Sequence, residues 1–483
     1  MQLTMRSETT RDPAVPAFAG WVVGAIAGVV GVVHLVCGVG GGYWFDEAYM
    51  VAIGRHHLAW GSADQPPLVP AVAGVLDWLG PGSFVLLRIP AVLATAGAVV
   101  VAALIARELG GDRRAQVLTA GAQATALWAN LVGHWLTPYT LEPVQWLTVI
   151  WLLMRWVRVR RDRLLLAIGV VAGIAAETKF QVLLLCAVLL VAAGVFGPRE
   201  LSRRPLLWVG VGVGALIFAP TLLWQAFNGW PQLRMGAVVA SEAEALYGGR
   251  LGVTLSLLTV GGIAATVLSL YGVWRLLRDP VLRAYRFVGV SAIVLFVFFV
   301  VTVGRPYYLD GIYGPLCAAG AVGLQQRRTA GGRWSWVAWP AYALSAAAAV
   351  GIVVVSTSAA DAGAAQTISQ RASTSYRELP ERDRRETIIM GESYIVAAYI
   401  DVYSPAGTPP AYSSNRAYGY FPAPPESARS VLYVGSEIDE LRGHFDRCRT
   451  VIGDDSSQKV WWCTGRHESW ARLWPRLRHL GVS

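Results

Sequence analysis

The sequence predicts an all-α polytopic membrane protein with a small α/β domain at its C-terminal end. Hydrophobic residues make up 54% of the 483 residues and charged residues only 15%, whereas a soluble domain carries about 25% charge. Apolar stretches long enough to cross a bilayer recur along most of the chain. Arginines gather in short clusters between these stretches. The three observations together predict a protein whose outer surface faces lipid.

The apolar stretches predict about eleven transmembrane helices within residues 17–356. With the N-terminal tail, residues 1–16, in the cytoplasm, every arginine cluster falls on the cytoplasmic side, as the positive-inside rule requires. One missed or added helix would move the later clusters to the wrong face. The expected helices are Ala17–Gly42, Phe84–Ala106, Val117–Gly133, Leu141–Val157, Leu164–Thr178, Val182–Phe196, Leu206–Ala226, Leu251–Trp274, Phe287–Val303, Leu309–Leu324 and Trp334–Ser356.

The net charge of +10 does not indicate a nucleic-acid partner. The arginines lie between apolar stretches rather than along one face, which is the pattern of membrane topology. Lys179 and Lys459 are the only lysines, and this arginine bias, with abundant Ala, Gly and Val, is typical of a GC-rich bacterial genome. We therefore expect a multi-pass protein of a bacterial plasma membrane, with membrane lipids around it.

Residues 357–483 are polar and are expected to form an extracytoplasmic domain. No His, Cys or carboxylate cluster in this tail has catalytic spacing. Cys448 and Cys463 lie in it, and both a disulfide and two free thiols remain open. Short elements are expected at Thr387–Ile389, Tyr394–Val402 and Ser430–Gly435, the last a buried strand followed by a helix from Glu437 to about Phe445.

Long outer loops are expected at residues 43–82 and 227–250. The first of them holds the first residues that suggest chemistry. Asp46 and Glu47 lie amid aromatic residues at the outer end of the first span, where charges are costly unless they serve a site or find partners. A carboxylate beside apolar rings has a raised proton affinity, which suits a general base. A metal-binding pair and an ordinary loop acid are the alternatives. Farther along, Asp64-Gln65-Pro66-Pro67 predicts a rigid bend.

Three cations could stabilise a negatively charged leaving group. Lys179, at the outer turn of a helical hairpin, is the only lysine of the membrane part, although it could also snorkel to the interface. Arg305 lies between the last helices with Tyr307 and Tyr308 beside it. Arg88 lies just inside a span and needs a phosphate or a protein carboxylate as its partner.

An ordered set of motifs covers nearly the whole chain and closely resembles bacterial glycosyltransferases of family 39. These are membrane-embedded type C glycosyltransferases, related to protein O-mannosyltransferases and aminoarabinose transferases. The motifs are Asp46-Glu47, Arg55-His56-His57, Asp64-Gln65-Pro66-Pro67-Leu68, Leu87-Arg88-Ile89-Pro90, Gly133-His134, Trp224-Gln225, Gly229-Trp230-Pro231, Gly304-Arg305-Pro306-Tyr307-Tyr308-Leu309 and Leu473-Trp474-Pro475-Arg476.

The resemblance implies transfer of a sugar from a polyprenyl-phosphate carrier to an acceptor hydroxyl on the outer face of the membrane. The acceptor class stays open between glycan, lipid and protein. Asp46 is the implied base of an inverting displacement, with Glu47 beside it. Some family members carry Asp where this chain has Tyr139. A divalent metal ion stays open, with Asp46, Glu47 and Glu142 as its candidate ligands. The expected substrate-binding residues are Lys179, Arg305, Tyr307, Tyr308, Arg88, Glu142, His134 and Gln65.

A transporter and a non-catalytic scaffold are the two alternative functions. A transporter or flippase of lipid-linked sugars predicts discontinuous helices in repeated halves and polar residues deep in the membrane. A non-catalytic sensor or scaffold gives no reason for the loop acids to combine with Lys179. An enzyme, in contrast, requires Asp46, Lys179 and Arg305 to converge within about 10–12 Å around one site.

Overall fold

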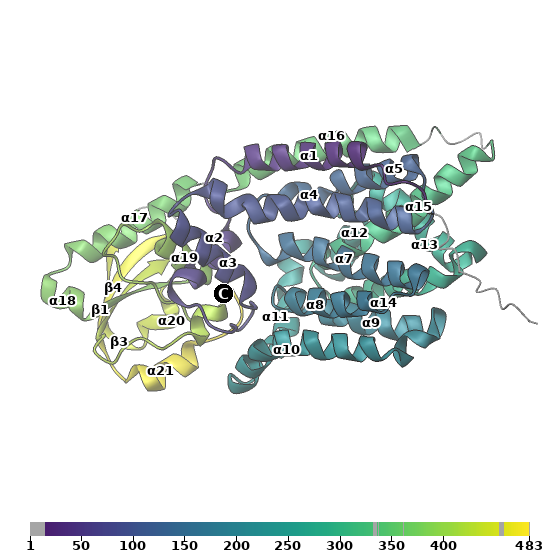
Figure 1. Ribbon diagram of the computed structural model, residues 1–483. Coiled ribbons are helices and arrows are strands. Elements are labelled where there is room, and N and C mark those ends of the chain that lie inside the picture. The colour runs from purple at the N-terminus through teal and green to yellow at the C-terminus, as the bar shows by residue number, and fades with distance from the viewer. Residues whose placement is uncertain (1–14, 332–335, 337, 361, 454–457, 483) are drawn as a thin grey trace, which may run out of the picture.

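The structure is a computed structural model that describes residues 15–331, 336, 338–360, 362–453 and 458–482. Long helices lie side by side in a bundle, and a small β-sheet sits at one end of it (Figure 1). Most of the predicted N-terminal tail, residues 1–16, and the predicted start of the last span at Trp334 lie outside the described residues.

The helical bundle contains thirteen helices among the described residues. They are α1 (Gly20–Cys37), α4 (Phe84–Glu108), α5 (Arg113–Ala124), α6 (Leu127–Val132), α7 (Pro138–Val159), α8 (Arg163–Ala176), α9 (Gln181–Phe196), α10 (Pro205–Phe227), α12 (Gly249–Thr259), α13 (Gly262–Arg278), α14 (Arg286–Val301), α15 (Asp310–Thr329) and α16 (Ala338–Ala359). Three 3-10 turns connect them, η1 (Arg199–Arg203), η2 (Pro280–Tyr285) and η3 (Pro306–Leu309).

The bundle is that of a multi-pass membrane protein. Within the described residues, five helical stretches are long and apolar enough to cross a bilayer, and a bent pair of helices makes a sixth. Large apolar side chains such as Leu216 and Val191 are exposed on the outside of the bundle, where lipid contact costs nothing. The predicted count of eleven stays a prediction, because several helices, such as the 14-residue α8, are short for a full crossing.

Two predicted spans are broken rather than continuous. The span expected at Val117–Gly133 is divided into α5 and α6, and that expected at Leu251–Trp274 is divided into α12 and α13, which meet at a bend of 88°. The two breaks face each other: the Trp128 amide donates to the Val260 carbonyl at 3.2 Å. Backbone groups that a helix break leaves free need hydrogen-bond partners away from water. The Trp128 amide of one break and the Val260 carbonyl of the other satisfy this need for each other.

Helices α8 and α10 pack backbone against backbone through glycines. A Cβ added at Gly169 would lie 2.1 Å from the Gly210 carbonyl oxygen, and one added at Gly173 would lie 3.0 Å from the Gly214 Cα. Each helix carries its two glycines four residues apart, which is the small-residue pattern of close helix packing in membranes. A side chain at Gly169 would force the two helices apart.

The two long loops expected at residues 43–82 and 227–250 are in fact helical. They form α2 (Phe45–His56), α3 (Leu68–Leu79) and α11 (Pro231–Tyr247), and α2 and α3 lie where the bundle meets the sheet (Figure 1). Proline starts a helix without losing a hydrogen bond, which explains why α11 begins at Pro231. The bend predicted at Pro66-Pro67 directly precedes α3, and α11 was not predicted at all.

The C-terminal region is a mixed four-stranded sheet with short helices. Strand β2 pairs parallel to β1 and antiparallel to β4, in the order β1-β2-β4-β3. The predicted buried strand at Ser430–Gly435 is confirmed, with all six residues buried. The elements are α17 (Ala362–Glu378), α18 (Glu381–Arg385), β1 (Thr387–Gly391), α19 (Tyr394–Tyr403), η5 (Arg416–Tyr420), β2 (Ser430–Gly435), α20 (Asp439–Arg442), β3 (Phe445–Ile452), β4 (Lys459–Arg466) and α21 (Trp470–Leu477).

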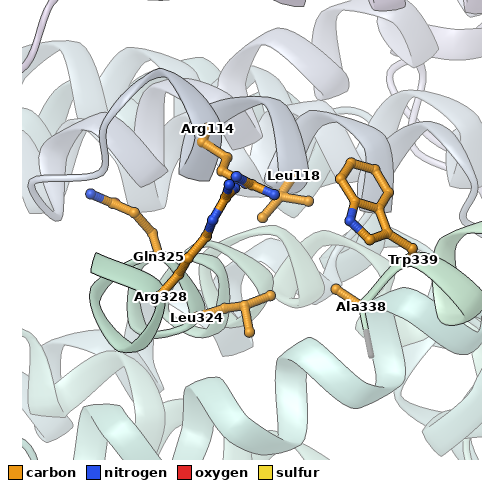
Figure 2. A pocket seen from close by; sticks show the side chains of 7 residues that line it. All are labelled: Arg114, Leu118, Leu324, Gln325, Arg328, Ala338 and Trp339. Atoms are coloured by element: carbon orange, nitrogen blue, oxygen red, sulfur yellow. The ribbon is translucent and has the colours of Figure 1, made fainter. Parts of the chain in front are cut away.

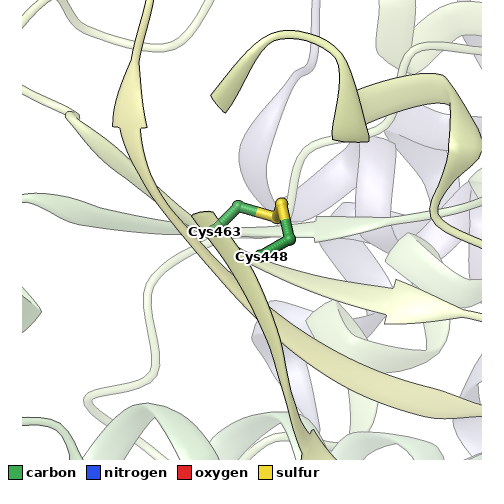
Figure 3. Close-up of a disulfide and its surroundings, with 2 residues drawn as sticks. All are labelled: Cys448 and Cys463. Atoms are coloured by element: carbon green, nitrogen blue, oxygen red, sulfur yellow. A yellow bond between two sulfur atoms is a disulfide. The ribbon is translucent and has the colours of Figure 1, made fainter. Parts of the chain in front are cut away.

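The helix expected from Glu437 to about Phe445 is confirmed only in part. Only the four residues of α20 are helical, and the chain then enters β3, which forms a hairpin with β4. A disulfide joins Cys448 to Cys463 across this hairpin (Figure 3). Pairing with β4 and the covalent link outweigh the local helical tendency of this short charged segment.

A small basic hollow lies among the ends of α5, α15 and α16. Arg114 and Arg328 extend toward each other there, with Trp339 beside them (Figure 2). Its volume of about 10 Å³ is that of a single water molecule. The arginines belong to two of the clusters that are predicted to lie on the cytoplasmic side. Asp46 lies instead at the end of the bundle that carries the sheet.

Candidate active site

Asp46 lies in the first turn of α2 and is held by two tyrosines from distant parts of the chain. The Tyr139 hydroxyl donates to Oδ2 of Asp46 at 3.1 Å, and the Tyr394 hydroxyl donates to Oδ1 at 3.3 Å. Tyr139 belongs to α7 of the bundle and Tyr394 to α19 of the C-terminal region. Tyr139 therefore acts as a hydrogen-bond donor to Asp46, and not as a second acid beside it.

The surroundings of Asp46 favour its protonated form at mildly acidic pH. Burial raises the pKa of Asp46 to about 6, and the nearby Asp64 carboxylate also raises it. Hydrogen bonds from Tyr139 and Tyr394 and the charge of Arg416 lower the pKa but do not cancel the effect of burial. A carboxylate with this pKa is ionised at neutral pH and still accepts a proton readily.

Lys179 lies at the turn between α8 and α9, as predicted, beside Glu142 of α7. Its Nζ lies 3.1 Å from Oε2 of Glu142, and 4.7 Å and 4.4 Å from the ring centres of Tyr307 and Tyr308. Burial lowers the pKa of Lys179, the carboxylates of Glu142 and Asp46 raise it, and Arg305 lowers it. Lys179 is thus a buried cation within the electrostatic reach of both Asp46 and Arg305.

Arg305 opens the turn that leads into α15. It forms an ion pair with Glu242 of α11 and lies 5.7 Å from the ring centre of Tyr247. Only 8% of Arg305 is exposed. Arg416 of the C-terminal region pairs with the same Glu242 at 2.8 Å. Two arginines from different parts of the chain thus share one carboxylate.

The structure brings Asp46, Lys179 and Arg305 around one group of aromatic rings. Tyr139, which donates to Asp46, has its ring 5.1 Å from that of Tyr307, and Tyr307 lies under Lys179. The contacts form a continuous path from the acid to the lysine. The site is therefore built from α2, α7, the α8–α9 turn, η3 and the C-terminal region.

Glu47 and Arg88 do not join this group. They form a buried ion pair, with Nη2 of Arg88 2.7 Å from Oε2 of Glu47, and their exposed fractions are 0% and 1%. Arg88 also donates to the carbonyls of Gly38 and Gly42, and Glu47 accepts the Leu136 amide. Neither side chain has capacity left for a substrate. The pair instead anchors α2, and so Asp46, to the bundle.

Two further predicted substrate residues make contacts within the protein. His134 is buried, with its Nδ1 3.4 Å from Nδ1 of His34 in α1. The backbone of Gln65 exchanges hydrogen bonds with Ser62 and closes the loop before α3. The Gln65 side chain extends toward Asp64, with Nε2 3.4 Å from Oδ2. These contacts position the loop that carries Asp64.

The carboxylates considered as metal ligands do not fit a metal site. Glu47 is paired with Arg88 and Glu142 with Lys179, so that each already has a cation. Among the described residues, no group of three or more His, Cys, Asp or Glu side chains is placed to hold a metal ion. The site described here is one of carboxylates, cations and tyrosines.

An apolar cavity of about 410 Å³ lies between α7, α8, α9 and α10. Its lining residues are almost entirely aliphatic or glycine, and it reaches Ala176 and Leu183, on either side of the turn that carries Lys179. The cavity thus extends to the ends of α8 and α9 on either side of the turn that carries Lys179. Aliphatic walls of this kind suit a hydrocarbon chain.

Several residues of the site were not singled out from the sequence. Tyr394 and Arg416 belong to the tail in which no catalytic spacing was found, and Glu242 lies in a segment expected to be a loop. Asp310 is 2% exposed at the start of α15, and neither of its carboxylate oxygens has a hydrogen-bond partner in the described part of the chain. A buried acid inside an apolar segment is a signal that could have identified Asp310.

Comparison with known proteins agrees with this architecture. Residues 64–224 match the family of dolichyl-phosphate-mannose-protein mannosyltransferases. No curated protein sequence matches the chain. The ArnT structures from Cupriavidus metallidurans, apo and bound to undecaprenyl phosphate, share 17% identity with it. They cover 92% of this chain and 98% of their own, with TM-scores of 0.66 and 0.65.

Two larger proteins share the fold over much of the chain. The oligosaccharyltransferase AglB from Archaeoglobus fulgidus has 12% identity and a TM-score of 0.53, with 86% of this chain and 70% of its own covered. The arabinofuranosyltransferase AftD from Mycobacteria has 13% identity and a TM-score of 0.56, with 94% and 40% covered. The family match over residues 64–224 and the shared fold confirm the predicted resemblance to the glycosyltransferase family 39 type and to the membrane-embedded type C glycosyltransferases.

Proposed function

We propose that the protein transfers a sugar from a polyprenyl-phosphate carrier to an acceptor hydroxyl at the outer face of the membrane. The observation that carries the proposal is the grouping of Asp46, Lys179 and Arg305 around one set of tyrosines, next to an apolar cavity. An acid with a raised pKa can take a proton, and buried cations can stabilise a departing phosphate.

The proposed reaction is a single displacement. The Asp46 carboxylate takes the proton of the acceptor hydroxyl, and the oxygen forms a bond to the anomeric carbon of the donor. The bond between that carbon and the phosphate oxygen breaks, and its electron pair leaves with the polyprenyl phosphate. Lys179 and Arg305 stabilise the charge that develops on the phosphate. One displacement inverts the anomeric centre and leaves no sugar attached to the protein.

The apolar cavity supports a lipid-linked donor. It offers aliphatic walls for an isoprenoid chain, and it reaches the helix ends on either side of the turn that carries Lys179, the cation proposed to meet the phosphate. One ArnT structure of the same fold is bound to undecaprenyl phosphate, and one AglB structure holds dolichol phosphate with an inhibitory peptide. A polyprenyl phosphate is accordingly the carrier class that we assign to this chain.

The orientation is part of the proposal. Residues 1–16 lie in the cytoplasm, residues 17–356 form the membrane part, and residues 357–483 lie outside, so that the site opens at the outer face. The disulfide between Cys448 and Cys463 supports this orientation, because disulfides persist in oxidising compartments outside the cytoplasm. Labelling of a cysteine introduced at exposed Gly407 in intact cells tests the orientation.

The direct test is turnover by the purified protein. It is incubated with a panel of undecaprenyl-phosphate sugars, both hexoses and pentoses, together with acceptor lipids, glycans and peptides. We expect release of undecaprenyl phosphate from one member of the panel. The same assay with Asp46→Asn should show none. Turnover at the wild-type rate in that variant would remove Asp46 from the mechanism.

A transporter of lipid-linked sugars is the second candidate, because one observation favours it. The α12–α13 pair is bent by 88°, and broken helices are common at transport sites. The two functions differ in one measurable outcome. A transporter moves the intact donor between leaflets of a vesicle, whereas the enzyme releases the carrier from its sugar. Movement without release would favour the transporter.

A further inference from the structure

One carboxylate of α11 lies between two buried arginines of the candidate site. Oε1 and Oε2 of Glu242 accept hydrogen bonds from Arg416 at 2.8 and 2.9 Å, and Oε2 also pairs with Arg305. Arg305 and Arg416 are 8% and 7% exposed. A carboxylate gripped by two guanidinium groups has the geometry with which arginines also bind a phosphate.

The two arginines have more capacity than Glu242 uses. Nη1 of Arg305 is buried and has no hydrogen-bond partner among the described residues. A buried donor without an acceptor costs stability, so its presence points to an additional acceptor. The phosphodiester of a sugar-linked donor offers two unesterified oxygens, as many as the carboxylate of Glu242, and the monoester that remains after transfer offers three.

The backbone at Arg416 is held in an uncommon conformation. Its φ angle is +51°, in the left-handed region that a residue with a Cβ adopts at an energetic cost. The Arg416 amide donates to the His479 carbonyl at 3.1 Å, which helps to fix this conformation. In this conformation the Arg416 side chain reaches Glu242 of α11. Its positive charge also lowers the pKa of Asp46 and of Asp64.

Helix α11, which carries Glu242, is lightly packed. Only three of its 17 residues are buried, Pro231, Met235 and Ala243. Met235 belongs to a small apolar cluster with Ala63 and Leu480, and Arg234 donates to the Tyr420 hydroxyl at 2.7 Å. Segments with few buried contacts open at low free-energy cost. The carboxylate that holds the two arginines is thus attached to an element that can move.

We propose that Arg416 and Arg305 together bind the phosphate of the lipid-linked donor, and that Glu242 occupies this anion site until the donor displaces it. The inference rests on the proposed function and adds to it a binding residue from the C-terminal region and a built-in competitor. Entry of a phosphate repels Glu242, and the release of Glu242 frees α11 from Arg305. The bound donor thus replaces one anion by another between the same two cations.

The direction in which Glu242→Gln changes the affinity for undecaprenyl phosphate distinguishes a displaceable counter-ion from a purely structural ion pair. Replacing Glu242 by Gln removes the competing charge, so the affinity for undecaprenyl phosphate should rise, by about tenfold if Glu242 occupies the site nine-tenths of the time. Replacing Arg416 by Gln should weaken binding by about tenfold or more. A merely structural ion pair predicts lower stability in both variants and tighter binding in neither.

The measurement is binding to the purified full-length protein in nanodiscs, with three probes. Undecaprenyl phosphate should bind more tightly to Glu242→Gln than to the wild type, inorganic phosphate should show the same direction at far lower affinity, and undecaprenol should bind both proteins equally. Glu244→Gln is the matched control, because it neutralises an exposed acid of the same helix. It should behave as the wild type.

Three results would overturn the inference. If Glu242→Gln binds undecaprenyl phosphate as weakly as the wild type does, or more weakly, then Glu242 is not a displaceable counter-ion. A gain confined to inorganic phosphate assigns the arginines to a free anion instead of the donor. Equal gains in Glu242→Gln and Glu244→Gln indicate only a general effect of charge. If neither the wild type nor Glu242→Gln binds undecaprenyl phosphate, the proposed function fails as well; if both bind it equally, only this inference fails.

Discussion

Adjacent carboxylates on α2 have opposite surroundings. Glu47 points into the bundle, where it is completely buried. Its carboxylate pairs with Arg88 and accepts a hydrogen bond from the Leu136 amide. Asp46 points toward the site and is held only by two neutral hydroxyls, from Tyr139 and Tyr394. The first arrangement fixes a charge permanently, whereas the second leaves a carboxylate able to exchange a proton.

The difference shows how the protein separates stability from chemistry within one helical turn. A buried ion pair such as that of Glu47 and Arg88 costs desolvation but imposes a specific arrangement when all of its hydrogen bonds are made. Burial raises the pKa of Asp46 to about 6, and the two hydroxyl donors, which lower it, satisfy the carboxylate without an ion-pair partner. The predictions below test whether the two carboxylates differ in this way.

The largest expected effect is on catalysis. Asp46→Asn removes the base but keeps its shape, and we expect transfer to fall by about 10²–10⁴-fold, with thermal stability close to that of the wild type. The rate of undecaprenyl phosphate release measures the first quantity, and a melting curve in detergent measures the second. A large loss of stability with little loss of rate would place Asp46 in the structural class with Glu47.

Glu47→Gln should have the opposite signature. It leaves the guanidinium of Arg88 buried without its counter-ion, and we expect the folded state to lose about 3 kcal/mol or more. The melting temperature and the yield of monodisperse protein report the loss. The double variant Glu47→Gln with Arg88→Met is the control, because removing both charges should restore part of the stability. Failure of that rescue would argue against the ion pair as the cause.

The pH dependence of transfer should follow the neighbours of Asp46. Because the base must be ionised, kcat/KM should fall as the pH drops below about 6. Tyr139→Phe removes a hydrogen bond that lowers the pKa, so the acidic limb should move to higher pH. Asp64→Asn removes a charge that raises the pKa, so the limb should move to lower pH. Shifts in the same direction would contradict Asp46 as the titrating group.

The smallest expected effect concerns a third buried carboxylate. Neither oxygen of Asp310 has a hydrogen-bond partner within the described residues, so Asp310 resembles Asp46 more than Glu47. Asp310→Leu should raise the free energy of unfolding by about 1 kcal/mol, because an unsatisfied buried polar group is removed. A denaturation curve tests this. A lower stability would show that Asp310 has the fixed partners of a structural acid.

The sequence was a good guide to the membrane part. The ordered motifs identified the family, and a helix covers all or part of each predicted span with described residues. The sequence did not predict the two places where a span is interrupted, between α5 and α6 and between α12 and α13. The bend between α12 and α13 depends on Gly262 at a φ angle of +84° packing against the Thr125 carbonyl. A contact between segments more than 100 residues apart leaves no local pattern.

Single residues show the same division at the site. Asp46, Lys179 and Arg305 were recognisable because charges beside apolar segments are costly and need a reason. Arg416, Tyr394 and Glu242 were not, since polar residues in a polar tail or loop are ordinary. Glu47 and Arg88, singled out by the same rule as Asp46, proved to be partners of each other.

Membrane insertion and the family resemblance could be predicted from the amino-acid sequence, because hydrophobicity and motif order can be read without a structure. The partners of the charged side chains followed only from the packing of the helices. The tertiary structure paired Glu47 with Arg88, gave Asp46 its two tyrosines and brought Arg416 from the C-terminal region to Glu242. Electrostatic energies depend on distance and burial, and both are set by packing between segments far apart in the chain.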